Sequence, residues 1–211
     1  MGNGATGQLP AWRRVGERGL RLDTGGMTLA RYAALTSASF PEVEDIIPAD
    51  GSLLVVIRRD MEVSEALRAA LGRPPGACPT SPTTLHEILV EYGGAAGPDL
   101  AALADKAGLD RCDYINSHAA VEYTVAFLGF QPGFPYLSGL PAALHTRRRS
   151  TPRVRVPAGS VAVGGPYTGI YPAEGPGGWH LIGRTAAVLF DPQRAAPALL
   201  QPGDRVRFVP A

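Results

Sequence analysis

The chain has 211 residues, of which 45% are hydrophobic and 18% charged, and its formal net charge is +1. No apolar run approaches the roughly 18 to 20 residues that cross a membrane, so we expect a soluble globular protein. The balanced charge excludes a general attraction to nucleic acid or to membrane surfaces. The first twelve residues lack the basic and long apolar segments of a secretory signal, which predicts a frayed tail and a cytoplasmic location.

A mixed α/β pattern occupies the first part of the chain. Residues 15–23 alternate loosely as a strand does, and residues 27–40 then carry apolar side chains at helical spacing. Residues 43–59 hold two β-branched runs separated by Pro-Ala-Asp-Gly, which predicts two strands joined by a turn. A short helix from about Ser64 to Leu71, with Ser64 as its N-cap, completes a βαββα unit.

The composition changes at residues 72–84, where four prolines and two glycines leave no apolar periodicity. We place a linker there. This predicts a small α/β domain over residues 1–80, including the tail and the Pro-rich linker, and a second domain over residues 81–211. The two cysteines, Cys78 and Cys112, lack the spacing of zinc ligands, so we predict no metal site and no disulfide framework.

The second domain begins with a strand over residues 85–94. A helix follows Pro98, which suits the first turn, and a second short helix is expected to be capped by Asp110. After another strand at 121–130, short β-type runs alternate with Gly/Pro turns, which indicates a closed or nearly closed β-barrel. The last run alternates apolar residues with arginines over 205–208, as a half-exposed strand does.

The commonest catalytic motifs are absent. The sequence has no GxxxxGK[ST] for a P-loop, no GxSxG nucleophile elbow, no HExxH, and no GxGxxG at a strand-to-helix turn. Any activity must therefore use other machinery.

Arginines gather in one short stretch, and guanidinium groups bind carboxylates and phosphates. A solvated face or a subunit contact is the alternative explanation. The case is better for the two that precede "VPAGSV", where small residues allow close approach and Ser160 supplies a hydroxyl. The five are Arg147, Arg148, Arg149, Arg153 and Arg155.

The segment "TGIYPAEGPGGWHLIGRT" combines polar and aromatic groups with several glycines, which suits a pocket. Glu174 could act as a general base, Arg184 as an anion clamp and Trp179 as a wall. The alternative is that Trp179 and Tyr171 are core anchors and that Glu174 merely neutralises an arginine. Thr168 and His180 complete the set.

A further candidate is His118, which with Glu122 lies where a predicted helix meets a strand and could handle a proton. A histidine at a helix end is more often structural, bonding the last free carbonyls.

Four linked stretches resemble one known family. They are "FLGFQPGFPYLSGLP", "TPRVRVPAGSVAVGG", "TGIYPAEGPGGWHLIGRT" and "PALLQPGDRVRFVP", in consistent order over roughly residues 85–210. The family contains allophanate hydrolase subunit 1, the B subunit of bacterial 5-oxoprolinase and the Kip inhibitor of a sporulation histidine kinase. The resemblance implies an α+β chain: a small N-terminal α/β domain followed by a cyclophilin-like β-barrel.

The resemblance also implies one component of an assembly rather than a complete enzyme. Family members pair with a homologous second chain, and in 5-oxoprolinase a third joins them. The leading expectation is the B subunit of an ATP-dependent 5-oxoprolinase, which converts 5-oxo-L-proline to L-glutamate, with ATP held by or shared with partners. One alternative is a urea carboxylase or allophanate-type component that requires a biotin-bearing partner. Another is a non-catalytic inhibitor that docks to a histidine kinase.

Under the leading expectation, site roles follow from the resemblance. Arg153 and Arg184 would hold a carboxylate or the transferred phosphoryl group. Glu174 or His118 would move protons, and Tyr136 and Trp179 would enclose the ring. The remaining substrate-binding candidates are Ser160, Thr168 and Tyr171.

The stretch at 127–141 contains three prolines and three glycines among aromatics, and we expect a rigid loop that shapes a pocket or a subunit contact. Phe130, Phe134 and Tyr136 would be its walls. A packed loop that holds the barrel shut is the alternative. The chain departs from the family pattern at Tyr167, where a glutamine is expected, and at Gly175, where a serine is expected.

Overall fold

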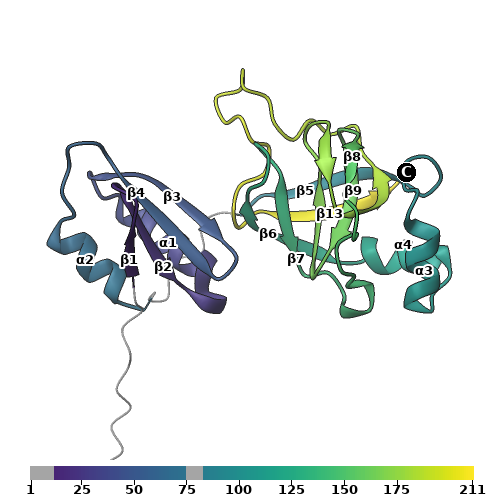
Figure 1. Cartoon of the computed structure of the whole chain (residues 1–211), viewed down its shortest axis with the longest axis horizontal. Helices are drawn as coiled ribbons and strands as arrows, with labels where there is room; N and C mark the ends of the chain where they lie inside the picture. The colour runs from purple at the N-terminus through teal and green to yellow at the C-terminus, as the bar shows by residue number, and fades with distance from the viewer. Residues whose placement is uncertain (1–11, 75–82) are drawn as a thin grey trace, which may run out of the picture. The chain divides into compact units, whose positions relative to one another are not determined.

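The computed structural model describes residues 12–74 and 83–211, which form two compact units, one on either side of residues 75–82 (Figure 1). The frayed tail, Cys78 and the expected boundary at residue 80 lie outside the described residues. No helix in the described part is long and apolar enough to cross a membrane. Cys112 is an exposed free thiol.

The first unit is a four-stranded antiparallel sheet with two helices. Its sheet runs in the order β1-β2-β4-β3, and nine buried apolar residues between Leu20 and Leu71 form its core. The elements are β1 (Trp12–Val15), β2 (Gly19–Asp23), the 3-10 turn η1 (Gly25–Met27), α1 (Thr28–Ala38), β3 (Val43–Ala49), β4 (Ser52–Ile57) and α2 (Glu65–Gly72).

Two local predictions for this unit are wrong. The single strand expected over residues 15–23 is a hairpin, because Gly16 takes a φ of 63° and the chain turns back there, so the unit is ββαββα. The β3–β4 turn is at Asp50 and Gly51, and Pro48 belongs to β3. β3 is one of the two edge strands of the sheet, where a proline without an amide hydrogen can face outward without removing a hydrogen bond between strands. The Ser64 cap is confirmed: its hydroxyl accepts from the Leu67 amide.

The second unit is a closed seven-stranded barrel in the order β10-β7-β6-β13-β5-β12-β9, with β8 and β11 forming a separate two-stranded ribbon. Its elements are β5 (Leu85–Tyr92), α3 (Leu100–Ala107), α4 (Arg111–Ala119), β6 (Glu122–Leu128), β7 (Pro135–Ser138), the 3-10 turn η2 (Ala142–Leu144), β8 (Arg153–Val156), β9 (Ser160–Gly164), β10 (Tyr167–Ile170), β11 (Gly175–Gly177), β12 (His180–Arg184) and β13 (Arg205–Pro210). The α+β class with a barrel is confirmed.

The barrel closes through its first and last strands. β13 runs parallel to β5 and antiparallel to β6. Val206 and Phe208 of β13 are buried, whereas Arg205 and Arg207 face outward and pair with acidic residues of the neighbouring strands. The half-exposed strand predicted from this alternation is confirmed. α3 and α4 lie side by side at one end of the unit (Figure 1).

The Gly/Pro/aromatic stretch at 127–141 is partly regular, contrary to expectation. β6 continues to Leu128 and β7 spans Pro135–Ser138, so the irregular parts are the turn at 129–134 and residues 139–141. The Gly129 amide donates to the Phe134 carbonyl at 3.1 Å and closes this turn. Pro135 is tolerated because it occupies the first position of its strand.

Candidate functional site

An aromatic pocket of about 170 Å³ lies where the turn at 129–134 meets β11 and the arginine stretch. Its lining combines five aromatic rings with two guanidinium groups and small residues. The lining residues are Phe130, Phe134, Tyr136, Arg148, Arg149, Pro152, Tyr171, Gly177, Gly178 and Trp179. The three predicted site residues Tyr136, Tyr171 and Trp179 are therefore brought together here.

Phe134 is the centre of the aromatic wall. Its ring meets those of Tyr136, Tyr171 and Trp179 edge to face, with centroid distances of 5.2, 5.2 and 5.4 Å. Such arrangements stabilise each pair by roughly 0.5–1.5 kcal/mol beyond the buried area. Phe134, Tyr171 and Trp179 are buried, so they are core anchors and pocket walls at once.

Phe130 stands at the mouth of the pocket with 60% of its surface exposed and a φ of 70°. A positive φ is uncommon for a bulky residue and is maintained here by the closed turn. Gly133 also has a positive φ, 78°, and a side chain there would meet the Phe190 Cβ at 2.8 Å. A side chain at Gly133 would therefore disturb this turn, and its rigidity remains a prediction.

Arginines form the cationic edge. The backbone amide of Arg149 donates to the Gly178 carbonyl at 2.8 Å, which fixes the chain beside the pocket. The guanidiniums of Arg149 and Arg153 both donate to Asp99 Oδ1, at 3.4 and 2.8 Å. Arg153 is opposite Gly177 in the β8–β11 register, and its Nη1 is buried without a partner among the described residues. Arg148 is exposed at the rim.

Asp99 is the carboxylate that organises this edge. Besides the two arginines, its Oδ2 accepts from the Leu181 amide at 2.7 Å. Burial alone would raise the pKa of Asp99, but the hydrogen bonds from Arg153 and Leu181 and the nearby positive charge lower it overall. Asp99 therefore stays ionised. Sequence reasoning missed it, because an aspartate at the first turn of a helix reads as an ordinary cap.

Glu174 does not line the pocket; it immediately precedes β11, which contains the lining residue Gly177. It accepts from Arg155 Nε at 2.7 Å, and both side chains are largely exposed, at 48% and 75%. Arg155 is on β8 and Glu174 immediately precedes β11, so the pair bridges the ribbon. A serine at the neighbouring Gly175 would require Gln131 to move, since a Cβ there would meet Gln131 Nε2 at 2.7 Å.

His118 lies inside the barrel, away from the pocket lining, and is fully buried. Thr168 donates its single hydroxyl proton to the Ala162 carbonyl, so it accepts from His118 Nε2 at 3.0 Å. His118 Nδ1 then accepts from the Tyr92 hydroxyl at 2.8 Å. Burial lowers the pKa of His118 from 6.5 to about 3, so the ring is neutral at neutral pH.

The remaining predicted residues serve the barrel wall. Thr168 is the fully buried partner of His118. Ser160 is buried and donates to the Pro157 carbonyl at 2.8 Å. Arg184 is opposite Ser160 in the β9–β12 register and donates to the Ala158 carbonyl at 3.1 Å. None of the three lines the aromatic pocket.

The pocket is suited to bind rather than to transform. Its flat apolar walls fit a small ring, and its guanidiniums fit a negative charge. Among its lining residues there is no carboxylate, histidine or cysteine. No group of three or more acidic, histidine or cysteine residues in the described part could hold a metal ion.

Residues 12–200 match the sequence family described as the carboxyltransferase domain, subdomain C and D. The chain belongs to this family. The family resemblance inferred from the four linked stretches is confirmed.

A protein of Escherichia coli O157:H7, named as the B subunit of 5-oxoprolinase, is 50% identical over 174 residues, which cover 81% of this chain and 79% of that relative. The crystal structure of TTHA0988 matches with a TM-score of 0.78 at 39% identity, over 92% of this chain but 40% of the other. This chain thus spans less than half of TTHA0988. Urea amidolyase of K. lactis matches with a TM-score of 0.68 at 20% identity, over 95% of this chain and 15% of that one, which shows a shared fold.

Proposed function

We propose that this chain is the B subunit of an ATP-dependent 5-oxoprolinase, which opens the lactam ring of 5-oxo-L-proline to give L-glutamate. The 50% identity to a protein named as the B subunit of 5-oxoprolinase supports this. The observation that carries the proposal is the pocket itself: 5-oxoproline is a small, nearly flat ring with one carboxylate, and the pocket has flat aromatic walls with an arginine edge.

In the proposed complex the ring lies among Tyr136, Tyr171 and Trp179, and the carboxylate faces Arg148 and Arg149. Arg153 supplies a further guanidinium behind Gly177, with a buried Nη1 able to donate. Holding the ring in one orientation lowers the entropic part of the barrier. ATP would transfer its γ-phosphoryl group to the lactam oxygen and leave as ADP. Water would then add to the ring carbon, the ring C–N bond would break to free the amine of glutamate, and phosphate would leave as the new carboxylate forms, while the guanidiniums would stabilise the added negative charge.

The lining has no carboxylate, histidine or cysteine, so we propose that this site is completed by partner proteins. These are a homologous second component of the C type and a third of the A type, all in the cytoplasm. ATP is held by a partner or shared with one, in keeping with the absence of a P-loop from the sequence. We propose that Glu174, an exposed carboxylate just before β11, exchanges the proton when the partners complete the site. We assign His118, Thr168, Ser160 and Arg184 supporting roles in the barrel.

The alternative of a urea carboxylase or allophanate-type component, with a biotin-bearing partner, rests on the likeness to urea amidolyase. At 20% identity that likeness concerns the fold alone. We therefore prefer the lactam substrate.

The test is 5-oxoproline-dependent glutamate release and ATP hydrolysis by this chain combined with its A-type and C-type partners, with each component omitted in turn. We expect activity only with all components present, and we expect Arg148→Ala to raise KM for 5-oxoproline. The matched control is Arg194→Ala, an arginine of the same unit that pairs with Asp191 on the surface. A folded, assembled complex that releases no glutamate would refute the proposal; capture of a histidine kinase by the inactive chain would then favour the docking alternative.

A further inference from the structure

Asp99 occupies the N-cap position of α3 but does not cap it. Its side chain makes no hydrogen bond to the first turn of the helix, although an aspartate at this position usually does. Instead, both carboxylate oxygens point to the β8–β12 side, where they accept from Arg149, Arg153 and the Leu181 amide. A local stabilisation available to α3 is given up for these contacts.

The position of Asp99 is fixed by its own backbone. Its amide donates to the Leu181 carbonyl at 3.0 Å, so backbone and side chain both bond to the same residue of β12. Gly97 allows this approach, since a side chain there would meet the Ile182 carbonyl oxygen at 2.0 Å. Asp99 is 13% exposed at its side chain and thus largely shielded from water, which strengthens its ion pairs.

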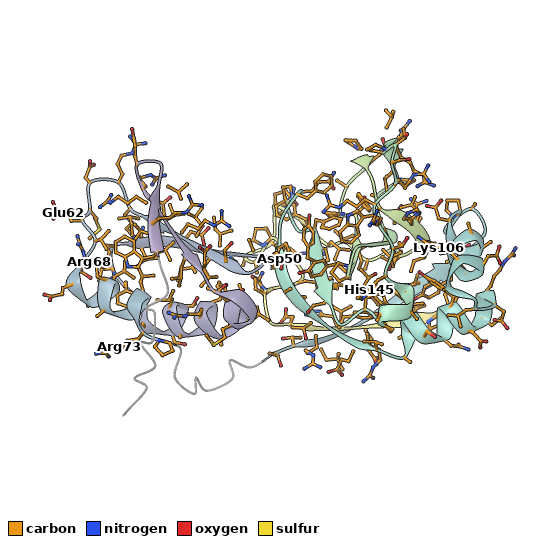
Figure 2. All side chains as sticks on the ribbon, turned by 60° about the horizontal axis from the view of Figure 1, so that its bottom comes forward. Asp50, Glu62, Arg68, Arg73, Lys106 and His145 are labelled. Atoms are coloured by element: carbon orange, nitrogen blue, oxygen red, sulfur yellow. The ribbon has the colours of Figure 1, made fainter. Side chains whose placement is uncertain are left out.

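α3 also holds the arginine stretch from its other end. Lys106 donates to Thr146 Oγ1 at 3.1 Å, and the Thr146 carbonyl accepts from the Gly165 amide. Figure 2 labels Lys106, which is on α3, and His145, which immediately precedes Thr146 in the chain. The segment from Thr146 to Arg153 is therefore tied to α3 at both ends.

The charges at this edge do not cancel. One carboxylate, Asp99, faces the two cations Arg149 and Arg153, which leaves one surplus positive charge. Arg148, at the pocket rim, has no acidic partner within salt-bridge distance in the described part of the chain. Arg153 Nη1 is buried with its donor capacity unused. An anion bound in the pocket would compensate this excess positive charge.

We propose that Asp99 is a positioning residue: it fixes the guanidinium of Arg149, which lines the aromatic pocket, and that of Arg153 on the adjoining strand β8, so that the pocket binds a small anionic ring compound through its carboxylate. This deepens the proposed function and rests on it for the identity of that compound. Asp99 touches no ligand itself. Its negative charge would repel an anion, so its contribution is geometric.

The charge of Asp99 and its positioning of the arginines affect anion affinity in opposite directions. Asp99→Asn raises the local positive charge by one and still offers an oxygen to the Leu181 amide. If Asp99 acted only through its charge, anions would bind more tightly to this variant. If Asp99 positions the arginines, they are released to solvent and anions bind more weakly, by about tenfold for the loss of one oriented guanidinium contact.

The measurement is a titration with 5-oxoproline and, separately, with inorganic phosphate, followed by the emission of Trp179. Trp12, the only other tryptophan, is replaced by phenylalanine so that the signal reports the pocket. Asp191→Asn, which removes an arginine-paired carboxylate elsewhere in the same unit, is the charge-matched control and should leave both affinities within about twofold. If Asp99→Asn does not fold, Asp99→Glu keeps the charge but displaces the carboxylate, and the same weakening is expected.

Weaker binding of both anions, or of phosphate alone, to the Asp99 variants supports the proposal. Unchanged or tighter binding overturns it, as does a wild-type pocket that binds neither anion. If the wild-type chain binds phosphate but not 5-oxoproline, the phosphate affinities alone decide the role of Asp99, and glutamate release by the assembled complex decides the substrate. In an active reconstituted complex, Asp99→Asn should raise KM for 5-oxoproline with little change in kcat.

Discussion

The buried imidazole of His118 should make the barrel unit acid-sensitive. Burial lowers its pKa from 6.5 to about 3. Between these two pH values the imidazole is protonated in the unfolded chain and neutral in the folded chain. This destabilisation is therefore negligible above pH 6.5 and increases as the pH falls toward 3. Each pH unit in this window costs about 1.4 kcal/mol, and the step from pH 7 to pH 5 costs about 2 kcal/mol.

The perturbation that isolates this effect is His118→Gln. A glutamine amide can donate to Thr168 and accept from Tyr92 as the imidazole does, but it does not titrate. Denaturant unfolding is followed by Trp179 emission in the Trp12→Phe background, at pH 7 and at pH 5, for both proteins. Whatever its stability at pH 7, the glutamine variant should lose about 2 kcal/mol less than the parent between the two pH values.

The carboxylates titrate alike in both proteins, so their contribution to the loss of stability cancels when the two losses are subtracted. Equal losses would refute the reasoning, and would mean that the histidine is protonated in the folded barrel. A larger loss in the glutamine variant would contradict the sign of the shift.

Three further predictions concern single sites. Ser64→Ala removes the cap of α2 and should lower the stability of the first unit by about 1 kcal/mol in denaturant unfolding; an unchanged midpoint would mean that another group takes over the capping. Gly97→Ala should destabilise the barrel unit by about 3 kcal/mol, since the new methyl overlaps the Ile182 carbonyl, and calorimetry would detect a lowered Tm. Arg155→Ala should leave Tm unchanged because its ion pair with Glu174 is exposed, and a marked drop in Tm would show that the pair carries structural weight.

Local signals in the sequence predicted much of the architecture. Ser64 and Asp110 are caps because their side chains accept from the first turn, a contact that depends only on nearby residues. The alternation over 205–208 predicted the inward and outward faces of β13 for a similar reason. The hairpin at residues 12–23 was missed because a short loose alternation does not show where a strand is interrupted.

The site was only partly predictable. Aromatic and glycine density located the walls at Tyr136, Tyr171 and Trp179, since such density is itself a property of the sequence. Asp99 was not found, because its partners are 50 to 82 residues away along the chain and only the folded barrel joins them. The same topology puts His118 inside the barrel. A histidine at the end of a helix carries no sequence signal that it will be buried. The positions of Asp99 and His118 depend on how the barrel closes between distant strands, and no local sequence pattern predicts that.

The parallel pairing of β5 with β13 also governs when the barrel can form. The Thr84 amide donates to Asp204 across 120 residues, so β5, which pairs with β12 on one side, has no partner on its other side until almost the whole unit is synthesised. Contacts of such high sequence separation make folding slow and leave the edge of β5 that faces β13 unpaired on the ribosome. The first unit, with its own core, can be complete by then. Nascent chains stalled before residue 205 should accordingly show a protease-resistant first unit joined to a protease-sensitive remainder.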